Sequence, residues 1–188
     1  MTTLDQPYIN ATQTWLNKLI IGYNLCPFAK QERDRDSIRY SVDHHVEVEA
    51  CLLKVILECL KLDTDKNIET TLVIFAHAFQ EFDDYLDFLA LAEALIDEQG
   101  YEGTYQLASF HPEYCFEGES QDDPANYTNR SPYPMLHLLR EDSIEQAISQ
   151  HPDIEGVPQR NIELTRSLGL DRLRSLLESC FPSKKPLE

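Results

Sequence analysis

Hydrophobic residues recur at helical spacing along several stretches of the chain, and each stretch predicts a helix that packs through one apolar face. Helices are expected over residues 8–23, 46–62, 82–99, 143–149 and 161–180. Pro27 would stop the first helix, an Asp142–Glu145 capping box would begin the fourth, and Gly169 would interrupt the last. The pattern therefore places helices at both ends of the chain and between its predicted strands.

Shorter runs that alternate, or that are rich in β-branched residues, predict four strands over residues 37–42, 70–79, 104–110 and 135–140. Because helices separate the first three strands, right-handed crossovers would make them parallel, whereas the fourth follows a long loop and could be antiparallel. We therefore predict an α/β fold, with a mixed, mainly parallel four-stranded sheet covered by helices and a long ordered loop before the last strand.

The length of 188 residues indicates a single domain over 1–188. It would comprise an N-terminal helix over 8–23, an α/β body over 37–150 and a C-terminal helical segment over 161–180. No run approaches the ~20 apolar residues of a membrane span, and the N-terminus lacks the pattern of a signal peptide, so we expect a soluble, cytoplasmic protein.

The composition narrows the classes of function. A formal net charge of −17 argues against nucleic acid and anionic membranes as partners, because phosphate binding needs clustered Lys and Arg. The five cysteines include no CxxC pair, which argues against a disulfide framework or a zinc ribbon. The motifs GxGxxG, GxxxxGK[ST] and GxSxG are also missing, so no nucleotide cofactor is indicated. The oligomeric state stays open.

Histidines stand at the ends of the first three predicted strands. His44 and His45 follow the first, His77 lies near the end of the second and His111 follows the third. The carboxyl ends of parallel strands meet at one edge of a sheet, where open α/β sheets bind ligands. We therefore predict that His77 and His111 share an edge and that a ligand pocket lies there.

The segment between the last two strands, residues 111–134, is much longer than an ordinary connection. Its aromatic residues and four prolines favour an ordered loop. Between Asn67 and Asn129 the chain has 14 Asp and Glu residues and no Lys or Arg, and Arg130 ends that interval. Its guanidinium would either clamp an anionic ligand or hold the loop in place, with the neighbouring Asp122 and Asp123 supplying an anion when no ligand is bound.

The phrases NLCPFAK, SFHP and DDPANYTNRSPYPMLHLLRE, followed later by Arg160–Asn161, resemble the bacterial family catalogued as domain of unknown function 1415. The resemblance covers nearly the whole chain and implies no activity. Together with the polar groups around Arg130, it marks these candidate ligand-binding residues: Asn126, Thr128, Asn129, Arg130, Ser131, His137, Arg140, Arg160 and Asn161. A purely structural alternative is that the polar loop residues cap their own backbone.

The first functional hypothesis is an enzyme that binds a small anionic metabolite at the carboxyl edge of the sheet. His111 would be the general base, because an imidazole titrates near neutral pH. Asp122 or Asp123 would orient it, Arg130 would clamp the anion, and Cys26 would be an optional nucleophile.

Two alternatives remain beside the enzyme. One is a divalent-metal site built from His77, His111 and either Asp122 or Asp123, with Cys115 as a weaker ligand. The other is a non-catalytic acidic module that docks basic partners. A divalent metal is the one cofactor under consideration, and the sequence does not decide whether the protein is an enzyme.

Overall fold

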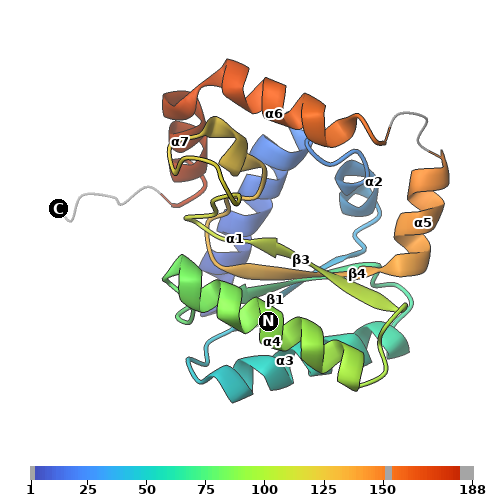
Figure 1. The fold of residues 1–188 in the computed structure, drawn as a ribbon. Helices are drawn as coiled ribbons and strands as arrows, with labels where there is room; N and C mark the ends of the chain where they lie inside the picture. The colour runs from blue at the N-terminus through green and yellow to red at the C-terminus, as the bar shows by residue number, and fades with distance from the viewer. Residues whose placement is uncertain (1–2, 151–153, 183–188) are drawn as a thin grey trace.

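The computed structural model describes residues 3–150 and 154–182, in which a four-stranded sheet lies between two groups of helices (Figure 1). In sheet order the strands are β1 (Ile38–Asp43), β2 (Thr70–Phe75), β4 (Met135–Arg140) and β3 (Tyr105–Phe110). Only β1 and β2 pair in parallel, whereas β4 is antiparallel to both of its neighbours. The sheet is mixed, but the prediction of a mainly parallel sheet is wrong, because β4 lies between β2 and β3.

Two helices, α3 (Val48–Thr64) and α4 (Phe82–Glu98), cover one face of the sheet (Figure 1). The elements on the other side are α1 (Gln6–Trp15), its π-helical continuation η1 (Leu16–Ile21), α2 (Ala29–Asp34), α5 (Glu141–Gln150), α6 (Val157–Leu168) and α7 (Leu170–Glu178). Gly169, with φ 80°, separates the last two helices as predicted. The sequence did not predict α2, and α5 begins before the expected capping box, at Glu141.

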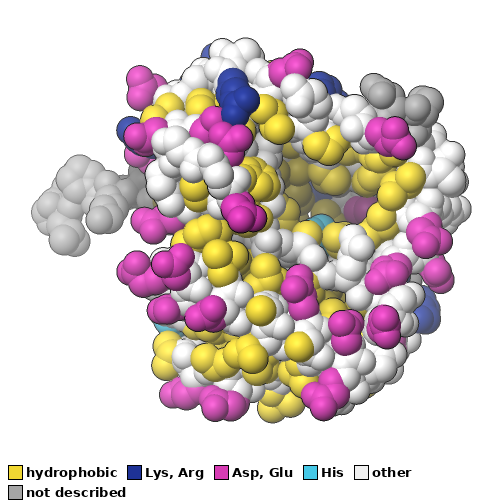
Figure 2. Space-filling view, viewed as in Figure 1, with side chains coloured by type: hydrophobic (Ala, Val, Ile, Leu, Met, Phe, Trp, Pro, Cys, Tyr) yellow, Lys and Arg dark blue, Asp and Glu magenta, His cyan; other side chains and the backbone are white. Residues whose placement is uncertain are grey.

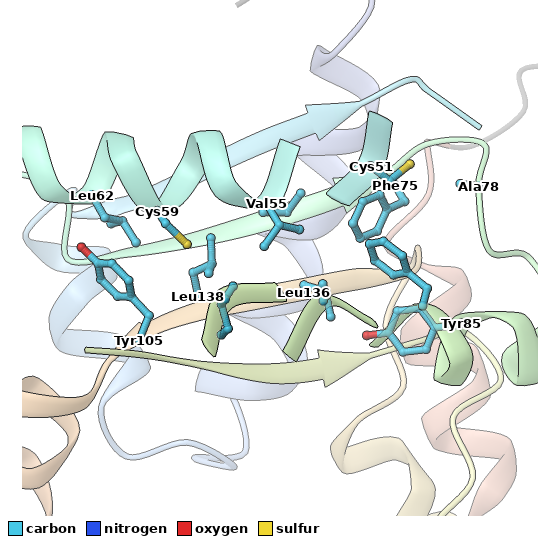
Figure 3. Close-up of a cluster of buried hydrophobic side chains, with 14 residues drawn as sticks. Cys51, Val55, Cys59, Leu62, Phe75, Ala78, Tyr85, Tyr105, Leu136 and Leu138 are labelled. Carbon is cyan, nitrogen blue, oxygen red and sulfur yellow. The ribbon is translucent and has the colours of Figure 1, made fainter. Parts of the chain in front are cut away.

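The face under α3 and α4 is closed by a well-packed core (Figure 3). Figure 3 shows Val55 and Leu62 of α3 pointing toward Leu136 and Leu138 of β4, and all four side chains are fully buried. Because side chains alternate along a strand, this packing directs the intervening His137 to the opposite face. The core thereby fixes which β4 residues face the second group of helices.

On the second face, α1 and η1 cover the part of the sheet near the carboxyl ends of β1, β2 and β3. Trp15 and Leu19 pack there with Ile74 and Met135. The π-helical turn is a rare geometry that is often found near functional sites. It also requires Gly22 at its end, since a Cβ at Gly22 would lie 2.3 Å from the carbonyl oxygen of the residue four places earlier. The rest of this face is left free of α1.

Candidate functional site

A cavity of about 340 Å³ lies on the part of the second face that α1 and η1 leave uncovered. Leu72, His137 and Ala108 form the middle of its floor and are neighbours across β2, β4 and β3. Figure 2 shows the hollow, which is walled mainly by hydrophobic side chains. We call it the sheet cavity, and its walls also include Trp15, Leu16, Ile20, Cys26, Phe28, Ala29, Ile38, Phe110, Leu139, Ile144 and Ala147.

His137 places an unpaired hydrogen-bond acceptor on the floor of the sheet cavity, whose lining also includes the polar side chains of Thr70, Gln106 and Ser143. Its Nε2 lies 2.6 Å from Thr70 Oγ1, and that oxygen lies 2.5 Å from the Leu138 carbonyl oxygen. A carbonyl can only accept, so the Thr70 hydroxyl donates to Leu138 and accepts from the Nε2–H of His137. Nδ1 then carries the lone pair, and among the described residues it has no hydrogen-bond partner and is not sealed into the core.

Burial lowers the pKa of His137 to about 4. The side chain is therefore neutral near pH 7, where protonating it would cost about 4 kcal/mol, or 1.36 kcal/mol for each of three pH units. A group that binds a proton so weakly is a poor general base at neutral pH. His137 is suited to accepting a hydrogen bond rather than to abstracting a proton.

Carboxylates outnumber usable cations around the sheet cavity. Glu32 and Glu69 contribute to its lining and are half-buried. Among residues 3–150 and 154–182, Arg140 is the only Lys or Arg of the lining, and its guanidinium donates to the carbonyl groups of Leu62 and Ile68, at 2.7 and 3.0 Å. These described residues therefore offer a ligand in this cavity no unpaired Lys or Arg side chain.

A second cavity, of about 590 Å³, lies between η1, the long loop and the start of α6. It shares Ile20, Cys26 and Phe110 with the sheet cavity. Cys26 is a free, half-buried thiol in the wall that the two cavities have in common. We call this second space the loop cavity, and its other lining residues are Leu25, Phe116, Glu117, Glu119, Ala125, Thr128, Asn129, Val157, Pro158, Asn161 and Ile162.

Arg160 and Asn161 hold the turn that carries Cys26. Arg160 Nη2 donates to the Asn24 carbonyl, and Asn161 Nδ2 donates to the Leu25 carbonyl at 2.7 Å. Asn24 has φ 53°, in the left-handed region that Asn tolerates better than most residues. Both predicted ligand-binding residues thus bind backbone of the turn, and Asn161 also lines the loop cavity.

The predicted histidines do share one edge of the sheet, because β1, β2 and β3 run in the same direction. His44 Nδ1 and His77 Nε2 lie 3.4 Å apart, and both side chains are exposed. His45 Nδ1 lies 2.6 Å from Oδ1 of the buried Asp43. Neither cavity includes any of these residues, although both include Phe110, the last residue of β3.

His111 is fully buried against the rings of Phe82 and Tyr85. Its Nε2 lies 2.9 Å from the Phe79 carbonyl oxygen, and its Nδ1 accepts from the Glu113 backbone N–H at 3.0 Å. Burial also lowers the pKa of His111. Both ring nitrogens therefore bind backbone, and neither is free to act as the general base that we expected.

Arg130 ties the long loop together. Its Nε donates to the Tyr114 carbonyl at 3.0 Å, its Nη2 donates to the Gln121 carbonyl at 2.7 Å, and its guanidinium lies 4.9 Å from the centre of the Tyr127 ring. The Arg130 carbonyl accepts from Trp15 Nε1 at 2.8 Å. Arg130 lines neither cavity, and its side chain binds carbonyl groups in place of the two aspartates that we predicted.

The other polar residues of the loop mostly bind its backbone. Asn126 is fully buried, accepts from the Phe116 N–H and donates to the Ser120 carbonyl. Asp123 caps the 3-10 helix η2 (Pro124–Thr128) and pairs with Arg166 at 2.7 Å, which lowers the pKa of Asp123 to about 2. The remaining loop candidates also form hydrogen bonds within the loop or to the adjoining strand: Cys115, Asp122, Thr128, Asn129 and Ser131.

The predicted metal ligands lie in different environments. His77 is exposed at the sheet edge, His111 is buried, and Cys115 Sγ lies 3.5 Å from the carbonyl oxygen of Glu119. Within residues 3–150 and 154–182, no group of three or more His, Cys, Asp or Glu side chains is arranged to hold a metal ion. In the same part of the chain, no helix combines the length and apolar character required to cross a bilayer.

Sequence reasoning missed most of the sheet-cavity floor. Thr70, Leu72 and Ala108 read as ordinary strand residues, and His137 was noted only through the resemblance. One signal was present, because the strand MLHLLR places a single polar imidazole between leucines. Strand alternation puts that imidazole on the face opposite Leu136 and Leu138.

A family model described as "Protein of unknown function (DUF1415)" matches residues 7–175 and confirms the resemblance. No curated protein and no solved structure matches the chain. Several residues of the phrases that carry the resemblance line the two cavities, namely Cys26, Thr128, Asn129, His137, Arg140 and Asn161.

Proposed function

Starting from the finding that the chain belongs to the DUF1415 family, we propose that the protein binds a small, uncharged and largely apolar molecule in the sheet cavity. The observation that carries this proposal is the unpaired Nδ1 of His137 between Leu72 and Ala108 in the middle of the floor. A polar group that faces a cavity without a partner in the protein binds water or a ligand group that takes the place of that water. The ligand therefore carries an O–H or N–H group that donates to Nδ1.

The volume of the sheet cavity suits a molecule larger than a single aromatic ring. An engineered apolar cavity of about 150 Å³ in another protein binds benzene. The sheet cavity, at about 340 Å³, is more than twice as large and lies within the range of small-molecule sites.

The charges around the cavity favour an uncharged ligand. Glu69 would repel a carboxylate or phosphate, Glu32 is paired with Arg35 at 3.3 Å, and the Arg140 guanidinium is already bonded on the α3 side of the sheet. A buried anion without a counter-charge is strongly disfavoured. The sheet cavity therefore does not favour the anionic metabolite of the first hypothesis. The hypothesis of a divalent-metal site has no support either, because no group of three potential metal ligands occurs among the described residues.

The experiment compares two ligands of nearly equal shape, indole and 1-benzofuran, by titration calorimetry. Indole has an N–H donor and 1-benzofuran does not. A net hydrogen bond contributes about 0.5–1.5 kcal/mol, so we expect indole to bind roughly 2- to 13-fold more tightly. His137→Phe should remove this preference, because it keeps an aromatic ring and removes the acceptor.

Cavity filling locates the binding site. Ala108→Phe should abolish binding of both ligands, since the new ring would occupy the floor beside His137. Ala90→Phe is the matched control, on the exposed side of α4 and away from the cavity. Binding that survives Ala108→Phe, or equal affinity of the wild type for indole and 1-benzofuran, would overturn the proposal.

A further inference from the structure

We infer that the sheet cavity and the loop cavity form one continuous site for an elongated molecule, with an uncharged hydrogen-bond donor at one end and a long apolar tail. This inference rests on the proposed function and extends it from the head of the ligand to its whole length. The two cavities share Ile20, Cys26 and Phe110, so they adjoin each other at one wall. A ligand that is too long for the sheet cavity would extend past Cys26 into the loop cavity.

Three polar side chains of the loop cavity are already bonded to the protein. Thr128 Oγ1 donates to the Ala125 carbonyl at 3.0 Å, Asn129 Nδ2 donates to the Ser109 carbonyl at 3.1 Å, and Asn161 Nδ2 donates to backbone at 2.7 Å. Their donors are therefore not available to a ligand head group. What remains for a ligand is mainly the apolar surface of residues such as Phe116 and Ile162.

The positions of the free acceptor and of the apolar surface determine which end of the ligand lies in which cavity. The free acceptor, His137 Nδ1, lies in the sheet cavity, so the donor group binds there and the tail runs into the loop cavity. The loop cavity also carries the exposed carboxylate of Glu117, which disfavours an anionic tail end, whereas Glu119 is paired with Arg166 at 3.2 Å. A neutral, straight-chain alcohol has the chemistry that both parts of the site accept.

The test is a series of 1-alkanols from butanol to dodecanol, with affinity measured by calorimetry. Each buried methylene should tighten binding about fourfold as long as the chain still enters apolar space. In the wild type the affinity should continue to increase with chain length through the longer alkanols. In Ile162→Trp, which obstructs the loop cavity, the increase should stop at a shorter chain while butanol binds unchanged. Ile148→Trp makes the same substitution at an exposed position of α5 outside both cavities and should behave like the wild type.

Failure of this inference is distinguishable from failure of the proposed function. If affinity stops rising at the same chain length in the wild type and in Ile162→Trp, the cavities are separate sites, while continued binding of butanol leaves the proposed function standing. If no alkanol binds, both ideas are overturned.

A second measurement does not depend on the folding of Ile162→Trp. In Cys115→Ser, Cys26 is the one remaining cysteine of the chain that is not buried. Saturating 1-decanol should slow alkylation of Cys26 by N-ethylmaleimide at least several-fold, as followed by mass spectrometry of the Cys26 peptide. Unchanged alkylation with decanol bound would show that the chain does not pass Cys26, and would overturn the inference.

Discussion

Replacing His137 with Phe should reverse the order of stability of the two proteins between neutral and mildly acidic pH. The folded-state pKa of His137 is about 4, below the value of about 6.5 for histidine in an unfolded chain. As the pH falls below 6.5, the unfolded chain binds a proton at this position and the folded protein does not. The wild type therefore loses stability as the pH falls from about 6.5 to about 4, and the Phe variant does not lose this contribution.

The size of the effect follows from the same two values. Between about pH 7.5 and about pH 5, the single-site linkage relation gives a loss of about 2 kcal/mol for the wild type. At pH 7.5 the variant lacks the hydrogen bond from Nε2 to Thr70, which stabilises the fold by about 1 kcal/mol. We therefore expect His137→Phe to be about 1 kcal/mol less stable at pH 7.5 and about 1 kcal/mol more stable at pH 5.

Urea unfolding at these two pH values, followed by circular dichroism, measures the difference directly. His111 also has a lowered pKa, but it is present in both proteins and its contribution cancels in the comparison. Parallel curves, with the same stability difference at both pH values, would refute the reasoning. In that case His137 would be hydrated through the cavity well enough to titrate normally.

The remaining predictions concern the elements that frame the cavities. Gly22→Ala should lower the free energy of unfolding by about 1–3 kcal/mol, because its Cβ would lie 2.3 Å from a backbone carbonyl oxygen, and urea unfolding would show it. Arg130→Lys should lower that free energy by about 1–3 kcal/mol, since an ammonium cannot span both carbonyl groups, yet leave the affinity of the folded protein for indole unchanged; a weaker affinity by calorimetry would contradict the structural role. Asn161→Ala should lower the free energy of unfolding by about 1–3 kcal/mol, because the Leu25 carbonyl loses its donor. The variant should also speed alkylation of Cys26, and an unchanged rate would show that the Asn161 hydrogen bond does not control the accessibility of this thiol.

The elements of the fold were predictable because each follows from a local pattern. The helix over 82–99 and the strand over 135–140 match α4 and β4 within a residue. Strand pairing was not predictable, because periodicity reports which face of a strand is buried and not which strand lies beside it. The insertion of β4 between β2 and β3 depends on the path of a 24-residue loop, whose direction no local pattern encodes.

The candidate site was predicted less well, for a physical reason that is visible in the loop. Unusual polar residues attract attention in a sequence, but Arg130 and Asn126 bind mainly backbone groups of the loop. A cavity, in contrast, is a deficit of side-chain volume, and Ala108 beside His137 gives little sign of it in the sequence. The single usable signal was the imidazole within an apolar strand.

The family phrases therefore describe the construction of the cavities more than a set of reacting groups. The turn NLCP supplies Cys26 at the common wall, and Arg160–Asn161 fix that turn by binding the two carbonyl groups that precede Cys26. The loop, held by Arg130, forms one side of the second cavity. A site made in this way has many polar residues that hydrogen-bond to the backbone around it, and His137 Nδ1 remains as an acceptor for the ligand. Substitutions among the supporting residues should therefore act first on stability, whereas substitution of His137 should act first on which ligand is bound.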